Sequence, residues 1–142
     1  MTYKCIIIDD STVHRLAISF LVQNHPKLEL VGAFHNPYKG IEAIYQQKAD
    51  IVFLDILLED VNSFELLDQI EIPAKIIMNS SWEKYTDKAQ EYKVDGFLTK
   101  PMQKSEFDIK VDVVLKGFEA KREQQMQILS PYFKPRPNVF QV

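Results

Sequence analysis

The feature that most constrains the fold is a run of four consecutive apolar residues, Ile51 to Leu54, that ends abruptly at Asp55. A continuous apolar run without polar alternation is typical of a strand buried on both faces, and such strands belong to parallel sheets covered by helices on both sides. In these sheets ligands bind beyond the carboxyl ends of the strands. Asp55 is therefore predicted to stand at a functional edge, although a lone aspartate after a strand also caps turns.

The rest of the chain repeats this alternation of strand and helix. Apolar runs that predict four further strands begin near Lys4, Leu28, Lys75 and Asp95, and helical periodicity follows each of them. Parallel strands need a crossover connection, usually a helix. We therefore predict a flavodoxin-like, doubly wound (βα)5 fold of class α/β, with a five-stranded parallel sheet in the order 2-1-3-4-5.

The domain boundaries follow from length and proline content. With 142 residues the chain suits one folded domain, predicted over residues 1–124. Residues 125–142 contain three prolines and are predicted to form an extended C-terminal tail or linker. In the first helix a stripe of apolar residues is predicted to face the core: Val13, Leu16, Ala17, Phe20 and Leu21.

Charge and cysteine usage exclude several classes of protein. The formal net charge is -3, which gives no basic footprint for direct binding of nucleic acid by this chain. The single cysteine, Cys5, rules out an internal disulfide framework and favours a reducing, cytoplasmic location. No apolar run reaches the length of a membrane span, so no membrane association is expected.

Polar residues follow four of the five predicted strands and would meet at one edge of the sheet. They are Asp9 and Asp10 after the first strand, Asp55 after the third, Ser80 after the fourth and Lys100 after the fifth. Three carboxylates about 4 Å apart repel by about 4 kcal/mol per pair at an effective dielectric near 20, so the cluster requires a cation. An all-oxygen acidic set is best suited to Mg²⁺.

Other sites are poorly supported by the sequence. His14, His25 and His35 lack the spacing of paired zinc ligands and are expected to be ordinary surface or loop residues. There is no phosphate-binding loop, dinucleotide-binding turn or nucleophile elbow. The acidic edge of the sheet is therefore the leading candidate for a functional site.

These residues, in this order, resemble the CheY-like receiver domain of two-component response regulators. The resemblance covers about Lys4 to Gly117, and a weaker likeness over residues 80–89 points to receivers linked to LytTR-type DNA-binding domains. It rests on the acidic pair and on a set of downstream positions: Leu54, Asp55, Ile56, Asn62, Glu65, Leu66, Ser80, Phe97, Lys100 and Pro101.

The resemblance implies that Asp55 accepts a phosphoryl group from a histidine kinase or phosphotransfer protein. Asp10, Asp55 and the backbone carbonyl of Leu57 would bind Mg²⁺, with Asp9 acting through water. Lys100 would pair first with the Asp55 carboxylate and then with a phosphoryl oxygen. As in the receivers that the chain resembles, the peptide bond between Lys100 and the following proline is expected to be cis.

Further roles are implied for residues around the acceptor. Ser80 would turn toward the phosphoryl group and Phe97 would rotate inward, which changes the face of the fourth helix, fifth strand and fifth helix. That face is the expected contact for partners, including a second copy of the chain. Leu57 and Trp82 would flank the approach of hydrolytic water and, because neither can orient it, prolong the phosphorylated state.

As a receiver, the chain would have no enzymatic activity beyond its own phosphorylation and dephosphorylation, and it would act on transcription through a linked effector.

Two other interpretations stay open. The chain could instead be a pseudo-receiver, an interaction module without phosphotransfer. A Mg²⁺-dependent phosphohydrolase is the third interpretation, but the D-x-D arrangement of haloacid dehalogenases is absent, because Ile56 and Leu57 follow Asp55.

Overall fold

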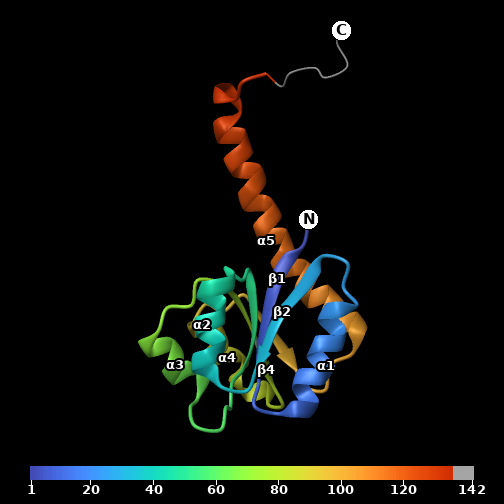
Figure 1. Ribbon diagram of the computed structural model, residues 1–142, viewed down its shortest axis with the longest axis vertical. Helices are drawn as coiled ribbons and strands as arrows, with labels where there is room; N and C mark the ends of the chain where they lie inside the picture. The colour runs from blue at the N-terminus through green and yellow to red at the C-terminus, as the bar shows by residue number, and fades with distance from the viewer. Residues whose placement is uncertain (136–142) are drawn as a thin grey trace.

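The computed structural model describes residues 1–135 and has the α/β architecture that the sequence predicts (Figure 1). All strand pairs are parallel, and the order β2-β1-β3-β4-β5 confirms the predicted topology. The strands are β1 Tyr3–Ile8, β2 Leu28–Phe34, β3 Ile51–Asp55, β4 Lys75–Ser80 and β5 Gly96–Thr99.

Helices connect the strands, and polar caps mark where several of them begin. The Ser11, Asn36 and Asn62 side chains accept hydrogen bonds from backbone N–H groups in the first turns of α1, α2 and α3. A 3₁₀ helix, Glu83–Tyr85, precedes the short α4. The α-helices are α1 Thr12–Gln23, α2 Pro37–Gln47, α3 Ser63–Gln69, α4 Thr86–Glu91 and α5 Lys104–Leu129.

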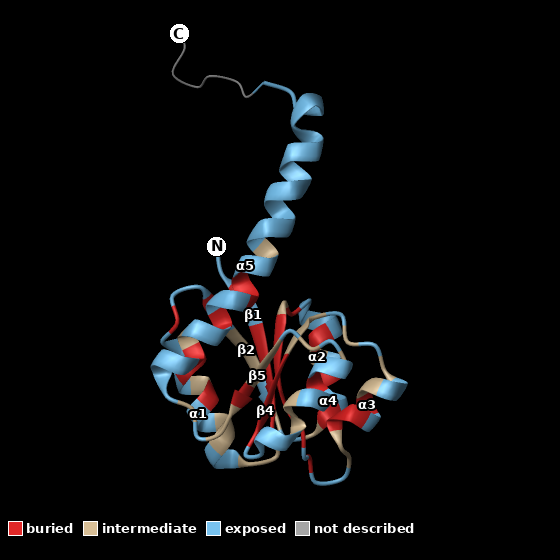
Figure 2. Cartoon of the chain, turned by 180° about the vertical axis from the view of Figure 1, so that it is seen from behind, coloured by how far each residue is buried: buried red, intermediate tan, exposed pale blue. Residues whose placement is uncertain are grey.

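Two apolar cores lie on opposite faces of the sheet (Figure 2). One core packs α1 and α5 against the sheet, and the other packs α2, α3 and α4. Every residue of β3 is buried, as its unbroken apolar run predicts. The helices cover the two faces of the sheet, and a site can form at the carboxyl ends of its strands.

The buried face of α1 differs from the prediction. Ile18, Leu21 and Val22 are its buried residues. Of the predicted stripe only Leu21 is buried, whereas Val13, Leu16 and Phe20 are 73%, 66% and 63% exposed. The helix is apolar on more than one face, so periodicity alone could not select the face that meets β1 and β2. An apolar patch of α1, consisting of Val13, Leu16 and Phe20, is consequently left in solvent.

Helix α5 extends well beyond the body of the domain (Figure 1). Phe107, Val111, Val114 and Leu115 anchor its first half in the core. The segment predicted as an extended tail from residue 125 begins in helix, because α5 continues to Leu129 and a 3₁₀ helix, Ser130–Tyr132, follows. The predicted tail beyond residue 135 lies outside the described residues. Within residues 1–135 no helix is long and apolar enough to cross a membrane.

Candidate functional site

Three carboxylates meet where β1 and β3 end side by side. Ile8 is paired with Leu54, so Asp9 and Asp10 come next to Asp55 as the two strands end. One carboxylate oxygen from each of the three aspartates lies within 4.8 Å of the other two. Asp9 and Asp55 are buried and Asp10 is half-buried. The structure therefore brings together the acidic residues that the sequence placed at this edge.

The environment of Asp55 disfavours the ionised form of its carboxyl group. Burial, followed by the charge of Asp9, raises the pKa of the Asp55 carboxyl, while Lys100 lowers it. The result is a pKa of about 7 in place of the ordinary 3.8. A cation bound beside the carboxylates would favour the ionised form, which is the form that can act as a nucleophile or a metal ligand.

Lys100 supplies the positive charge of the site. Its Nζ donates to Asp9 Oδ2 at 2.8 Å and lies 3.3 Å from Asp55 Oδ1. The Lys100 side chain is only 7% exposed, so these ion pairs are partly desolvated. The peptide bond between Lys100 and Pro101 is cis, as predicted. The lysine thus reaches from the loop after β5 to carboxylates at the ends of two other strands.

Two serine hydroxyls hold the strand ends around Asp55. Ser80, at the end of β4, is buried, and its Oγ accepts a hydrogen bond from the Trp82 backbone N–H at 3.0 Å. This leaves the Ser80 hydroxyl proton available to an acceptor in the site. Ser63 Oγ donates to the backbone carbonyl of Asp55. The role of Ser63 was missed, since nothing in the sequence pattern shows that the start of α3 folds back onto β3.

The loop after Asp55 is closed on itself. Leu57 forms an isolated bridge with Asn62, and the Leu58 N–H donates to the Val61 carbonyl at 3.2 Å. The Leu57 side chain and the indole of Trp82 are both exposed. They stand at the mouth of the site as large apolar groups without a carboxylate or amide.

A cavity of about 200 Å³ connects these groups. Seven of its lining residues offer polar side chains, and Leu57 and Trp82 are the apolar ones. Asp9 is not among them, because it is buried behind Lys100. The lining residues are Asp10, Ser11, His14, Asp55, Leu57, Ser80, Ser81, Trp82 and Lys100.

Phe97 lies apart from this cavity. It is paired with Met78 across β4 and β5, and it packs half-buried against the core formed by α2, α3 and α4. It also lines a surface hollow of about 280 Å³, together with α4 residues and Lys110 of α5. Phe97 therefore belongs to the face of α4, β5 and α5 that the sequence analysis singled out.

Two of the histidines, which were expected to be ordinary surface or loop residues, make specific contacts with distant side chains. His14 lines the cavity, and its Nδ1 lies 3.0 Å from Lys100 Nζ. His25 is buried, accepts from the Lys27 N–H at Nδ1 and contacts Asp112 Oδ1 through Nε2 at 3.1 Å. Both partnerships join residues 86 or 87 positions apart, which no local pattern reveals.

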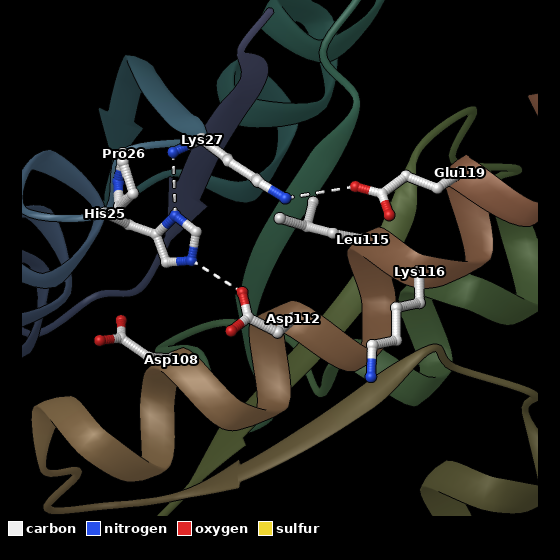
Figure 3. Close-up of a pocket in the computed structure, with 8 residues that line it drawn as sticks. All are labelled: His25, Pro26, Lys27, Asp108, Asp112, Leu115, Lys116 and Glu119. Atoms are coloured by element: carbon white, nitrogen blue, oxygen red, sulfur yellow. Dashed lines mark hydrogen bonds and ion pairs between the residues drawn. The ribbon is translucent and has the colours of Figure 1, made fainter.

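A larger hollow of about 470 Å³ surrounds His25, where the loop between α1 and β2 faces α5 (Figure 3). The Lys27 ammonium pairs with Glu119 of α5 at 3.3 Å, beside the His25–Asp112 contact. These links fasten the projecting helix to the body of the domain. Because these two links join the loop to α5 across the hollow, we assign the hollow a structural role.

Comparisons with known proteins agree with this geometry. Residues 5–112 match the family described as the response regulator receiver domain. The sensory transduction protein LytT of Bacillus cereus is 25% identical over 127 residues, which span 87% of this chain and 50% of that protein. A protein-glutamate methylesterase/protein-glutamine glutaminase of Geobacillus kaustophilus is 32% identical over 106 residues, which span 70% of this chain and 30% of that protein. The chain thus spans at most about half the length of these relatives.

Solved structures show the same fold. The signal receiver domain of a putative Luxo repressor protein from Vibrio parahaemolyticus superposes with a TM-score of 0.73 at 21% identity, covering 89% of this chain and 98% of that chain. The response regulatory domain of protein mrkE from Klebsiella pneumoniae gives a TM-score of 0.67 at 23% identity, with 84% and 98% covered. At these identities the likeness establishes the fold alone.

Proposed function

The chain belongs to the response regulator receiver domain family, and from this premise we propose that it is a phosphoryl-accepting switch with Asp55 as the acceptor. The observation that carries the proposal is the Lys100 ammonium, which is held between the buried carboxylates of Asp9 and Asp55 at the carboxyl edge of the sheet. Burying these charges costs desolvation free energy, and a plain interaction module would not need them.

The chemical step is a phosphoryl transfer between two side chains. A carboxylate oxygen of Asp55 attacks the phosphorus of a phosphohistidine on the donor protein. The phosphorus–nitrogen bond breaks, its electron pair stays on the donor imidazole, and an acyl phosphate forms on Asp55. Lys100, 3.3 Å from the carboxylate, then pairs with a phosphoryl oxygen. Positioning and charge carry most of the catalysis in such a transfer.

The donor set fits a hard divalent cation. Carboxylate oxygens lying within 4.8 Å of one another suit Mg²⁺, and a cation would offset the burial and the Asp9 charge that raise the pKa of Asp55. We assign Asp10, Asp55 and the Leu57 carbonyl to this ion, with Asp9 acting through water. When bound, Mg²⁺ supplies positive charge that offsets the negative charge of the transferring phosphoryl group.

The partner in this step is a histidine kinase or a phosphotransfer protein. The exposed apolar patch of α1 supports a docking site beside the cavity, since isolated domains seldom leave such a patch without a use. A second hollow of about 330 Å³ continues from α1 to Lys100, Pro101 and Met102. A donor helix laid on this surface would present its phosphohistidine to Asp55.

The phosphoryl group would act as a switch through Ser80 and Phe97. It adds close to two negative charges and three acceptor oxygens beside Asp55, and the free Ser80 proton is suited to one of them. Movement of Ser80 changes the packing below β4, which Phe97 can follow by turning inward. The face of α4, β5 and α5 would then favour a partner, including a second copy of the chain.

The output is proposed to lie in a linked effector. Relatives such as the sensory transduction protein LytT are about twice as long as the region they share with this chain. Helix α5 projects away from the domain in the direction of the C-terminus, which supports its use as a connection to such a segment (Figure 1). Regulation of transcription through that segment is the output we propose.

Phosphorylation by acetyl phosphate tests the proposal. With Mg²⁺, intact mass should show one added phosphoryl group on the wild type and on Asp60→Asn, a control at an exposed acid in the same loop. Asp55→Asn should gain none, and EDTA should prevent the adduct. Absence of an adduct on the wild type would favour the pseudo-receiver, and multiple turnovers without an adduct would favour a phosphohydrolase.

A further inference from the structure

The Lys100 ammonium is surrounded by acceptors from three separate elements. Asp9 follows β1, Asp55 ends β3, and the third acceptor is the imidazole of His14 on α1. Nζ lies 2.8 Å from Asp9 Oδ2, 3.3 Å from Asp55 Oδ1 and 3.0 Å from His14 Nδ1. The contacts with Asp9 and His14 are hydrogen bonds and the contact with Asp55 is an ion pair, and the ammonium is the donor in each because it has no acceptor.

The contact with Lys100 fixes the state of the His14 ring. Because the ammonium can only donate, Nδ1 must accept, and the ring proton of the neutral imidazole therefore stands on Nε2. The His14 side chain is 41% exposed, so it is not a core residue whose main duty is packing. Its backbone N–H completes the cap of α1 on Ser11 Oγ, which any residue at this position would do.

The three distances show what the imidazole contributes. Asp9 is buried and closer to the ammonium than Asp55, so the two carboxylates alone would draw Lys100 toward Asp9. His14 lines the cavity that contains Asp55, whereas Asp9 does not. The hydrogen bond to His14 therefore keeps the Lys100 ammonium at the cavity. The lysine then stands where an incoming phosphoryl group needs positive charge.

We propose that His14 is a positioning residue for phosphoryl transfer, which acts by holding the Lys100 ammonium beside Asp55 through the hydrogen bond to Nδ1. This inference rests on the proposed function. It also makes α1 part of the acceptor site, so that a donor docked on α1 contacts the same helix that positions the lysine. The substrate of the step remains the phosphoryl group of a phosphohistidine.

Two substitutions separate the hydrogen bond from the bulk of the ring. His14→Leu keeps a side chain of moderate size but offers no acceptor, whereas the Oδ1 atom of His14→Asn replaces Nδ1 at the same distance along the side chain. His35→Leu makes the same chemical change at an exposed histidine and serves as the matched control. Rates of adduct formation with acetyl phosphate and Mg²⁺ are followed by intact mass, with thermal unfolding measured for each variant.

We expect His14→Leu to be about three- to tenfold slower than the wild type, and His14→Asn and His35→Leu to remain within about twofold. Melting temperatures of both His14 variants should stay close to that of the wild type. A wild-type rate for His14→Leu, or an equally slow His14→Asn, would overturn the inference while leaving the proposed function intact. Failure of the wild type itself to accept phosphate would remove both.

A direct view of the ring gives a second test that is independent of the reaction rate. Long-range ¹H–¹⁵N spectra of the wild type should show His14 as the Nε2-protonated tautomer, with an Nδ1 resonance that shifts in Lys100→Ala. An Nδ1-protonated His14, or an Nδ1 resonance unchanged in Lys100→Ala, would exclude the contact on which the inference depends.

Discussion

Replacing Asp55 by asparagine should make the protein more stable at neutral pH while abolishing its proposed function. The Asp55 carboxyl has a pKa of about 7 in the folded protein, against an ordinary value of 3.8. A difference of about three pKa units corresponds to about 4 kcal/mol of unfolding free energy once the group is ionised. The pKa of about 7 already includes the attraction of Lys100, so we expect a gain of up to about 4 kcal/mol for Asp55→Asn at pH 8.

The pH dependence of this gain follows from the direction of the pKa shift. An acid with a raised pKa in the folded state binds a proton on folding between about pH 4 and pH 7. Wild-type stability therefore falls as the pH rises through this window, by at most about 1.4 kcal/mol per pH unit from this group. Asp55→Asn should lack this slope, so the two proteins should approach one another in stability near pH 4.

Urea unfolding followed by far-ultraviolet circular dichroism, in EDTA at pH 5 and pH 8, measures both effects. Addition of Mg²⁺ at pH 8 should stabilise the wild type more than Asp55→Asn, because the ion binds the folded acidic cluster. Asp60→Asn, at an exposed site, is the control and should differ little from the wild type. If Asp55→Asn were no more stable than the wild type at pH 8 in EDTA, the account of Asp55 as a destabilising buried charge would be wrong.

Three further predictions concern the lifetime, assembly and core of the domain. The double substitution Leu57→Asn with Trp82→Glu should speed loss of phosphate from Asp55 by about tenfold, near 1.4 kcal/mol of barrier, and unchanged hydrolysis would refute the shielding role. Beryllofluoride with Mg²⁺ should promote pairing through α4, β5 and α5, detected as faster sedimentation at high concentration, and a stable contact should bury about 800 Å² per partner. An unchanged sedimentation coefficient would count against pairing. Asn79→Leu should raise the unfolding free energy by about 1 kcal/mol, because neither polar atom of this buried amide has a partner within the described residues, and a loss of similar size in urea unfolding would contradict this.

Local sequence pattern was sufficient for the alternation of strands and helices and for the approximate place of the site. The unbroken apolar run before Asp55 predicts a doubly covered strand, and β3 is buried throughout. Parallel strands all end at the same edge, so residues that follow them, such as Asp9 and Lys100, must come near one another whatever the details of packing.

The same patterns failed where more than one local solution was available. In α1 the residues Val13, Leu16 and Phe20 have helical spacing as regular as any buried stripe, yet the helix turns Ile18, Leu21 and Val22 to the sheet. The predicted domain boundary lies at residue 124, but nothing before Ser130 stops α5. Local spacing limits the choices of face and length, and packing against the sheet makes the choice.

The sequence by itself determined which elements form and which charged groups follow the strands, because each depends on apolar runs and short spacings within one stretch of chain. Only the tertiary structure decided the charge state favoured by Asp55, the third partner of Lys100 and the face of α1 left in solvent. Burial and ion pairing arise between residues such as Asp9 and Lys100, which lie 91 positions apart. Their energies depend on distance and on exclusion of water, and both quantities exist only once the strands and helices have packed.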